Sequence, residues 1–213
     1  PYIPAVIKNA TIQNNTAKCG GGINASGPVK ISDTTITGNT ATTLEKWGGG
    51  GLNARIIPQS RYNNGWVFEL SGKVIITGNK AESVDNNLYF PVVDAGTMLP
   101  AVTGLAEGST IGVTTEVKPL NNGVISPVYI TSDAGNKNYF TSDESYEVKL
   151  DTDRNQLYII AESSTVTVTR GENMTASGDL KQTVLKNSPI ADVTITAADG
   201  YYFPEDYAAN LSK

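Results

Sequence analysis

The clearest pattern along the chain is a short run in which one isoleucine stands among β-forming and polar residues and is followed by asparagine and then alanine. It occurs around Ile12, Ile36 and Ile76. Alternation of apolar and polar positions is typical of a half-buried β-strand, and threonine suits the exposed side of the pleat because it is β-branched and polar. Each run therefore predicts a short strand with isoleucine facing inward, followed by a tight turn.

A second, glycine-rich signature follows each of these runs in the same order, and its three copies begin at Gly20, Gly48 and Asn86. A repeat of about two dozen residues with two short β-segments and glycine corners fits one coil of a parallel β-helix. Equivalent residues of successive coils stack about 4.8 Å apart, so asparagines at the same coil position are expected to form a ladder of amide hydrogen bonds. The predicted ladder consists of Asn15, Asn39 and Asn79.

The stretches 20–25 and 36–41 resemble coils of right-handed parallel β-helix repeat proteins on bacterial surfaces, including those of gut Gram-positive bacteria. The stretches 86–90, 108–114 and 138–143 are similar to the closing coils of such proteins. The resemblance covers residues 1–162 and implies an all-β fold, a right-handed parallel β-helix of few coils with closing strands. It also implies a secreted, extracellular protein attached to the bacterial cell surface or cell wall.

Residues 163–213 carry a different pattern, in which threonine and valine alternate strictly over residues 165–169. Such alternation is typical of an antiparallel strand with valine facing inward. The Gly-Tyr-Tyr-Phe-Pro stretch at 200–204 resembles the small all-β repeats near the C-termini of Gram-positive surface proteins. Three clear strands give only a marginal core, so we expect a partial antiparallel β-module and a chain that is part of a longer protein.

Composition then narrows the chemistry, because the chain has no histidine, one cysteine and a net charge of -5. Without imidazole there is no Ser/His/Asp triad, and one cysteine cannot form an internal disulfide or a cysteine-rich zinc site. The absence of a basic cluster argues against nucleic acid and anionic membranes, and no apolar run approaches the roughly 20 residues of a membrane span. We expect no cofactor, no metal and no membrane insertion.

An insertion at residues 55–68 carries most of the candidate ligand-binding residues. Its Asn-Gly pair at 64–65 is a strong hairpin signal, so this arm is expected to leave the coil and return. Exposed aromatic side chains beside arginine and asparagine would suit stacking on a sugar or docking on a protein. The alternative is that Trp66 and Phe68 fold back as a lid over the coil. The candidate ligand-binding residues are Trp47, Arg61, Tyr62, Asn63 and Trp66.

Two acidic patterns are candidate functional sites. Asp151, Asp153 and Asn155 begin like a calcium loop, in which oxygen ligands alternate. Gln156 stands where that loop needs glycine, and the flanking residues alternate as strands, so a plain hairpin turn is favoured. A glycosidase needs two carboxylates on one face, and no acidic residue before position 90 recurs at equivalent repeat positions. We therefore expect a protein that is not an enzyme.

These observations support three hypotheses about function. The first is a non-catalytic adhesin that acts as a monomer and binds a host glycan, a mucin or another secreted host protein, since solenoids offer extended recognition surfaces. The second is a structural spacer or stalk without a ligand of its own. The third is a fragment of a β-helix enzyme active on polysaccharides, which a groove with two acids about 5–10 Å apart would favour.

Overall fold

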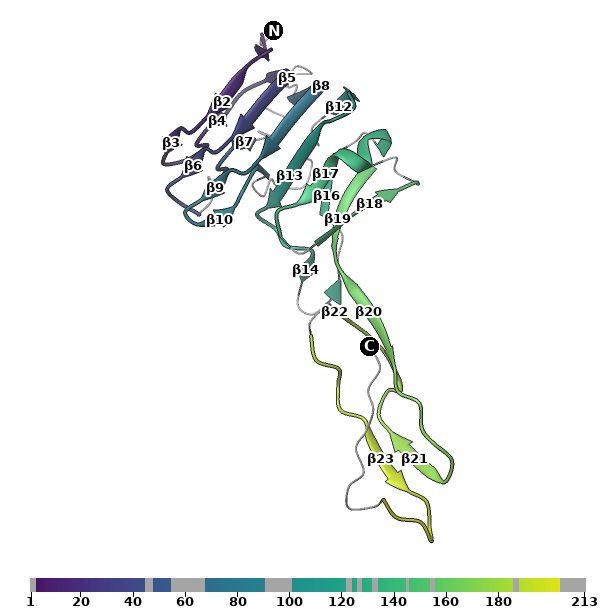
Figure 1. The fold of residues 1–213 in the computed structure, drawn as a ribbon. Coiled ribbons are helices and arrows are strands. Elements are labelled where there is room, and N and C mark those ends of the chain that lie inside the picture. Colours follow the sequence, from purple (N-terminus) through teal and green to yellow (C-terminus); the bar gives the residue numbers. More distant parts are fainter. Residues whose placement is uncertain are drawn as a thin grey trace. The chain divides into compact units, whose positions relative to one another are not determined.

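The computed structural model describes residues 3–44, 48–54, 68–90, 101–121, 124–125, 128–131, 134–144, 146–153, 156–185 and 188–203. They fall into two compact units, Pro1–Ala161 and Glu162–Lys213. The described residues are almost entirely strand and turn, with one short 3₁₀ helix, η2, at Ala134–Tyr139 (Figure 1). The prediction of an all-β chain is confirmed.

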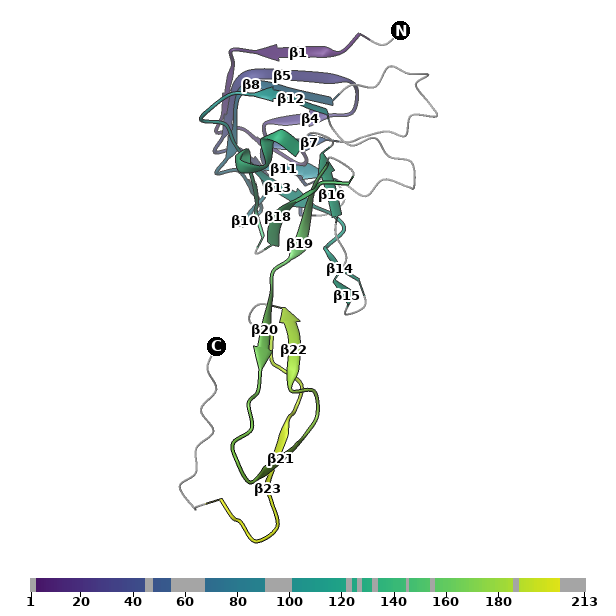
Figure 2. The ribbon, with the colours of Figure 1, turned by 90° about the vertical axis from the view of Figure 1, so that its right-hand side faces the viewer.

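The first unit winds through successive coils, and the longest strands lie side by side on one face. These strands run parallel, in the order β1, β5, β8 and β13 (Thr110–Thr115), with β2 also paired to β5 (Figures 1 and 2). Parallel pairing of strands far apart in sequence is what coil stacking produces. The strands of this first face are β1 (Ala5–Lys8), β2 (Thr11–Gln13), β5 (Val29–Thr37), β8 (Phe68–Thr77), β12 (Ala101–Leu105) and β17 (Phe140–Ser142).

Two shorter stacks complete each coil. After the first face the chain turns into a two-residue strand, passes the glycine-rich signature and enters a three-residue strand. The corner stack consists of β3 (Thr16–Ala17), β6 (Thr40–Ala41) and β9 (Lys80–Ala81), with β10 (Val84–Asp85) antiparallel to β9. The third stack, parallel throughout, consists of β4 (Ile23–Ala25), β7 (Leu52–Ala54) and β11 (Leu88–Phe90).

Strand β13 (Thr110–Thr115) closes the coil by joining two faces. Its start pairs with β8 on the first face, Ile111 opposite Ile76, and its end pairs with β11 on the third face, Val113 opposite Leu88. Because β13 pairs directly with both faces and not with the corner stack, the parallel sheet curves into a half-barrel. The closing strands expected from the sequence at 86–90, 108–114 and 138–143 correspond to β11, β13 and β17.

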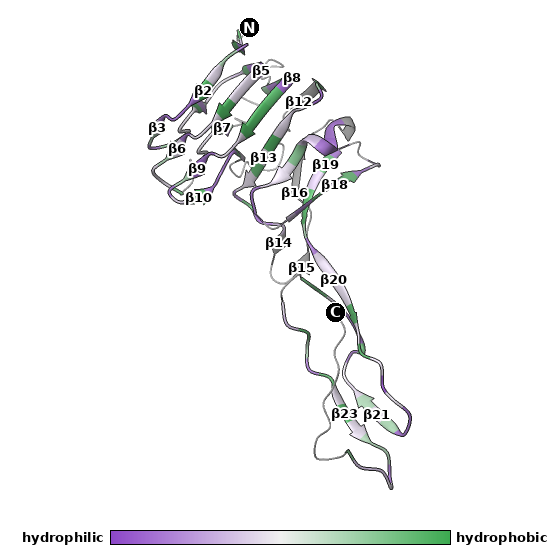
Figure 3. Cartoon of the chain, in the orientation of Figure 1, coloured by the Kyte–Doolittle hydropathy of each residue, from purple (hydrophilic) through white to green (hydrophobic). Residues whose placement is uncertain are grey.

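The register confirms the predicted repeat. Ile12 pairs with Ile36, Ile36 with Ile76, and Ile76 with Ile111. Ile36, Ile76 and Ile111 are fully buried. Like residues therefore stack on like along the core, and Figure 3 shows the apolar colour on β5, β8 and β13 while the corner stack is hydrophilic.

Glycine is needed at the corners for two different reasons. Gly38 and Gly78 each have φ of +66°, and Asn14 at the equivalent position has φ of +58°, which is the left-handed region that glycine and asparagine tolerate. Gly21 has no such angle, but a Cβ there would lie 2.5 Å from the Gly50 carbonyl oxygen. At Gly21 and Gly50 the reason is therefore the close approach of neighbouring coils.

An asparagine ladder runs through the first corner. Asn15 donates from its backbone N–H and its Nδ2–H to Asn39 Oδ1, at 3.0 and 2.9 Å. Asn39 donates in the same way to Asn79 Oδ1, at 3.0 and 2.9 Å, and Asn79 donates to Asn87 Oδ1, at 2.9 and 3.0 Å. The predicted ladder is confirmed, and Asn87 adds a rung that the sequence analysis missed.

The rest of the first unit is a small antiparallel sheet in the order β16 (Val128–Thr131), β19 (Gln156–Ala161), β18 (Tyr146–Asp151), together with the short hairpin β14 (Leu120–Asn121) and β15 (Val124–Ile125). Leu157 and Ile159 of β19 are fully buried and belong to the same apolar cluster as the coil core. This sheet therefore extends the core of the first unit.

The described residues of the second unit form two separate antiparallel ladders. Strand β20 (Ser163–Thr167) pairs with β22 (Lys181–Leu185), and β21 (Met174–Ser177) pairs with β23 (Thr194–Ala197). No residue described between 162 and 203 is buried, because the apolar side chains remain half-exposed.

Candidate functional site

The asparagine ladder ends at a carboxylate on the closing strands. Asp143 accepts hydrogen bonds from the Asn87 backbone N–H at 2.7 Å, from Asn87 Nδ2–H at 2.5 Å and from the Thr114 hydroxyl at 2.8 Å. Each asparagine of the ladder donates to the side-chain oxygen of the next one, and a carboxylate completes such a chain because it accepts without needing a further acceptor. Burial raises the pKa of Asp143, while its hydrogen bonds with Asn87 and Thr114 act in the opposite direction.

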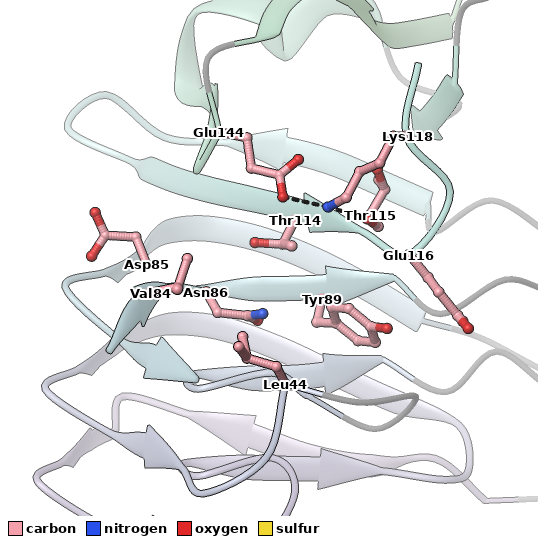
Figure 4. Close-up of a pocket in the computed structure, with 10 residues that line it drawn as sticks. All are labelled: Leu44, Val84, Asp85, Asn86, Tyr89, Thr114, Thr115, Glu116, Lys118 and Glu144. Atoms are coloured by element: carbon pink, nitrogen blue, oxygen red, sulfur yellow. Dashed lines mark hydrogen bonds and ion pairs between the residues drawn. The ribbon is translucent and has the colours of Figure 1, made fainter. Parts of the chain in front are cut away.

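A pocket of about 200 Å³ lies beside this end of the ladder, and Thr114 belongs to both (Figure 4). We call it the closing pocket. Its walls come from the loop after β6, the turn at β10, strand β11, the end of β13 and the residues that follow it. The lining residues are Leu44, Val84, Asp85, Asn86, Tyr89, Thr114, Thr115, Glu116, Lys118 and Glu144.

The floor of the closing pocket is polar and well buried. Asn86, Thr114 and Thr115 are at most 5% exposed. Asn86 Oδ1 accepts a hydrogen bond from the Gly49 N–H at 3.0 Å, and the Thr115 hydroxyl donates to the Val117 carbonyl at 2.7 Å. These side chains are fixed by the coil itself, so the floor is preorganised.

Tyr89 stands out in the pocket because the residue as a whole is buried, yet its hydroxyl is not among the buried atoms that lack a hydrogen-bond partner. It is 4% exposed, and its hydroxyl makes no hydrogen bond with any residue that the structure describes. In Figure 4 the hydroxyl points to the side of the pocket where Glu116 lies. Burial, and then the negative charge of Glu116, raises the pKa of Tyr89 to about 12. The phenol is therefore neutral at physiological pH.

Among the described lining residues the only cation, Lys118, is already engaged. Its Nζ forms an ion pair with Glu144 and donates to the Thr115 carbonyl at 3.0 Å. Asp85 lies on the opposite side, 3.7 Å from Lys80 Nζ, and both of these side chains are more than half exposed. Such exposed pairs are weak. The described lining holds three carboxylates and one ammonium.

The candidate ligand-binding residues of the sequence analysis, Trp47, Arg61, Tyr62, Asn63 and Trp66, lie outside the described residues, as does the hairpin at 64–65. The arm therefore stays a prediction. Next to it, Phe68 is described: it begins β8, is 3% exposed and makes an edge-to-face contact with Phe90 at 6.4 Å between ring centroids. This residue is part of the core.

At the calcium candidate, Asp151 pairs with Gln156 at the end of the β18–β19 hairpin, and Asp151 Oδ1 accepts a hydrogen bond from the Asp153 N–H at 3.0 Å. The hairpin turn favoured by the sequence is confirmed; Asn155 lies outside the described residues. Within the described ranges, no group of three or more acidic, histidine or cysteine side chains is placed to hold a metal ion.

Comparisons of the chain with protein-family models, with curated proteins and with solved structures return no match. Across the part of the chain that the structure describes, none of the helical segments is long and apolar enough to span a membrane.

The closing pocket was missed by the sequence analysis. Its lining comes from five stretches between residues 44 and 144, and none of them carries a local motif. One signal could have been used: Leu44, Val84 and Val117 are aliphatic residues in otherwise polar turns.

Proposed function

We infer that this chain is a non-catalytic binding module of a bacterial cell-surface or cell-wall-attached protein. In this proposal the first unit is a right-handed parallel β-helix, and the protein is an extracellular, monomeric adhesin whose ligand is a host glycan, a mucin or another secreted host protein. The resemblance of the coil motifs to bacterial surface proteins supports the localisation.

The closing pocket is the single observation that carries the proposal. It combines a fixed polar floor, including Asn86 and Thr115, with the exposed aliphatic side chains of Leu44 and Val84 at its rim. Pockets of this kind, in which a few oriented polar groups stand among apolar contacts, are typical of ligand sites. Because hydrogen bonds within the chain already hold Asn86 and Thr115 in place, the pocket is formed before any ligand arrives.

The test is binding of the purified chain to arrays of glycans and secreted host proteins. Val84→Arg, which places a long side chain at the pocket rim, is expected to abolish binding, whereas Val6→Arg on the edge strand β1 keeps it. Val84 and Val6 are 47% and 67% exposed, so neither change disturbs the core. A chain that binds nothing on either array would favour the spacer alternative.

Variants in the predicted aromatic arm provide a second, independent part of the same experiment. Tyr62→Ala and Trp66→Ala should lower binding if the arm takes part, and should leave it unchanged if the closing pocket acts alone. If these two variants lose binding while Val84→Arg still binds, the binding site is the aromatic arm and not the closing pocket.

Polysaccharide cleavage is the second candidate function, because Asp85, Glu116 and Glu144 all line the closing pocket. Two carboxylates around one site are what a glycosidase requires. Incubation of the chain with labelled oligosaccharides, followed by detection of new reducing ends, tests this candidate, and Glu116→Gln serves as the matched inactive variant. Product formation that Glu116→Gln abolishes would replace adhesion by catalysis.

A further inference from the structure

The first coil, residues 5–25, forms the open end of the stack. Among the described residues each of its four strands is an edge strand, since β1 and β2 pair only with β5, β3 only with β6, and β4 only with β7. In Figure 2 strand β1 lies at the edge of the first unit, with β5 beside it. All three faces of the coil therefore end in unpaired strand edges at the same place.

The apolar interior is also open at this end. The three inward isoleucines of the first coil are only half-buried, whereas the residues paired with them in the second coil are 0% exposed. An inward side chain of the second coil has an equivalent residue on both sides, and one of the first coil has it on one side only. The pairs are Ile7 with Ile31, Ile12 with Ile36 and Ile23 with Leu52.

The backbone of β1 presents hydrogen-bonding groups on its open side. The N–H groups of Ala5 and Asn9 donate toward β5, to the carbonyls of Pro28 and Ser32. In a parallel pair alternate residues bond to one neighbour, so the N–H groups of Val6 and Lys8 point to the open side. Both of these residues are exposed. Such an edge is a template for one more strand.

The asparagine ladder shows which kind of chain fits this edge. Asn39 Oδ1 accepts from the backbone N–H and the Nδ2–H of Asn15, the asparagine of the preceding coil, and Asn79 Oδ1 accepts in the same way from Asn39. Asn15 Oδ1 accepts no hydrogen bond from any residue that the structure describes. Its complement is the asparagine of one more coil. A second copy placed end to end presents the same acceptor and not the donors that the ladder requires.

The entry of the chain into β1 indicates the direction from which that coil comes. Pro4 precedes β1 as Pro28 precedes β5, and Ala5 pairs with Val29. Proline keeps the residue before it extended. At Pro28 the chain arrives from β4, in the third stack of the preceding coil. The same entry at Pro4 fits a chain that arrives from the third stack of a coil above β1.

We propose that the open end of the first coil is a docking surface for one further coil of the same repeat, supplied by the same polypeptide on the N-terminal side of β1. The strands of that coil pair in parallel with β1 and β2, its inward aliphatic side chains cover Ile7 and Ile12, and its asparagine donates to Asn15 Oδ1. The closing pocket lies at the other end of the coil, so this interface is independent of the proposed binding function.

The experiment builds the further coil from the repeat of the chain itself. Equivalent residues of the first two coils are 24 positions apart, so a second copy of residues 5–28 is inserted between Pro4 and Ala5 of the full chain. Backbone amide hydrogen exchange is then compared with that of the unmodified chain. The Val6 and Lys8 amides of the original coil should exchange at least about tenfold more slowly once the copy docks on them. The denaturant midpoint of the first unit should also rise, since each coil interface adds stability.

A mismatched copy is the control for the insertion. It carries Ile7→Asp and Ile12→Asp in the inserted residues only, which keeps the length and places two carboxylates over the apolar interior. This copy should leave the exchange of Val6 and Lys8 unchanged. Equal protection by the matched and the mismatched copy, or protection by neither, would overturn the proposal.

Sedimentation of the unmodified chain tests whether a second copy occupies this end instead. A monomer is expected. Val6→Pro removes an N–H that faces the open side, and an edge strand tolerates such a proline. A dimer of the unmodified chain that Val6→Pro dissociates would assign the open end to a second copy and would overturn the proposal.

Discussion

The coil of the first unit and the two ladders of the second are both built from short strands rich in threonine and valine, yet they bury their side chains to very different extents. In the coil, Ile36, Leu52 and Leu88 are 0% exposed. In the second unit, no residue described between 162 and 203 is buried. Alternation of apolar and polar residues is therefore enough to form strands in both regions, but it does not by itself create a core.

The difference comes from how strands cover one another. In the coil each inward residue has an equivalent residue in the coils on either side, as Ile36 has Ile12 and Ile76, and the three faces enclose the same interior. Among the described residues of the second unit each strand has one partner, and the two ladders are separate sheets. Repetition along the coil turns weak two-stranded pairing into cooperative burial.

The largest expected effect is the loss of stability when an amide side chain buried in the coil is removed. Asn79→Ala removes the acceptor of the Asn39 N–H and the donor to the Ile36 carbonyl, at 3.0 and 2.9 Å, inside the coil. Because each orphaned buried group costs about 1–3 kcal/mol, the free energy of unfolding of the first unit should fall by at least about 3 kcal/mol. Guanidinium unfolding followed by amide hydrogen exchange in each unit measures this.

Gln182→Ala is the matched control in the second unit. The Gln182 side chain also braces backbone, since it donates to the Asp179 carbonyl at 2.8 Å and accepts from the Ala191 N–H at 2.6 Å, but near solvent. Water replaces these bonds, so the loss should be about 1 kcal/mol or less. Equal losses of unfolding free energy in the two variants would show that burial does not increase the contribution of the asparagine ladder to stability.

The next largest effect is the loss of stability when an isoleucine is shortened in a strand of either unit. Ile36→Ala in β5 should lower the free energy of unfolding of the first unit by about 2–4 kcal/mol, since a cavity opens in a packed column. Ile195→Ala in β23 should cost less than about 1 kcal/mol in the second unit, because Ile195 is already half-exposed. Both are measured by denaturant unfolding resolved per unit, and a large loss for Ile195→Ala would indicate a core that the described residues do not contain.

Local sequence predicted the coil well because each coil repeats the same local demands. The positions of Ile36, Asn39 and Gly38 follow from one strand and one turn, and the register places them on their equivalents in the next coil. The hairpin of β18 and β19 was predicted for the same reason. In all these cases neighbours in sequence contain the information.

The closing end was harder to predict because its geometry depends on contacts between distant residues. Asn87 continues the ladder although it lies only eight residues after Asn79, and Asp143 terminates it from 56 residues further on. Gly112 is required there since a Cβ would collide with the Asp143 carboxylate and the Asn87 amide. No periodicity connects these three residues, so neither the ladder end nor the pocket beside it was visible in the repeat.

The smallest expected effect is a loss of stability in alkali, caused by the ionisation of Tyr89 at the closing end of the coil. The pKa of Tyr89 is about 12 in the folded chain against 10.0 for the free group, so between these values the folded state keeps a proton that the unfolded state has lost. The stabilisation is therefore complete below pH 10 and is lost as the pH rises toward 12. The pocket admits solvent, which reduces the loss to about 1–2 kcal/mol. Unfolding of the first unit at pH 9 to 12 measures it, with Tyr89→Phe as the comparison: subtracting the two curves cancels every other titrating group. Identical curves would mean that Tyr89 is as hydrated in the folded chain as in the unfolded one.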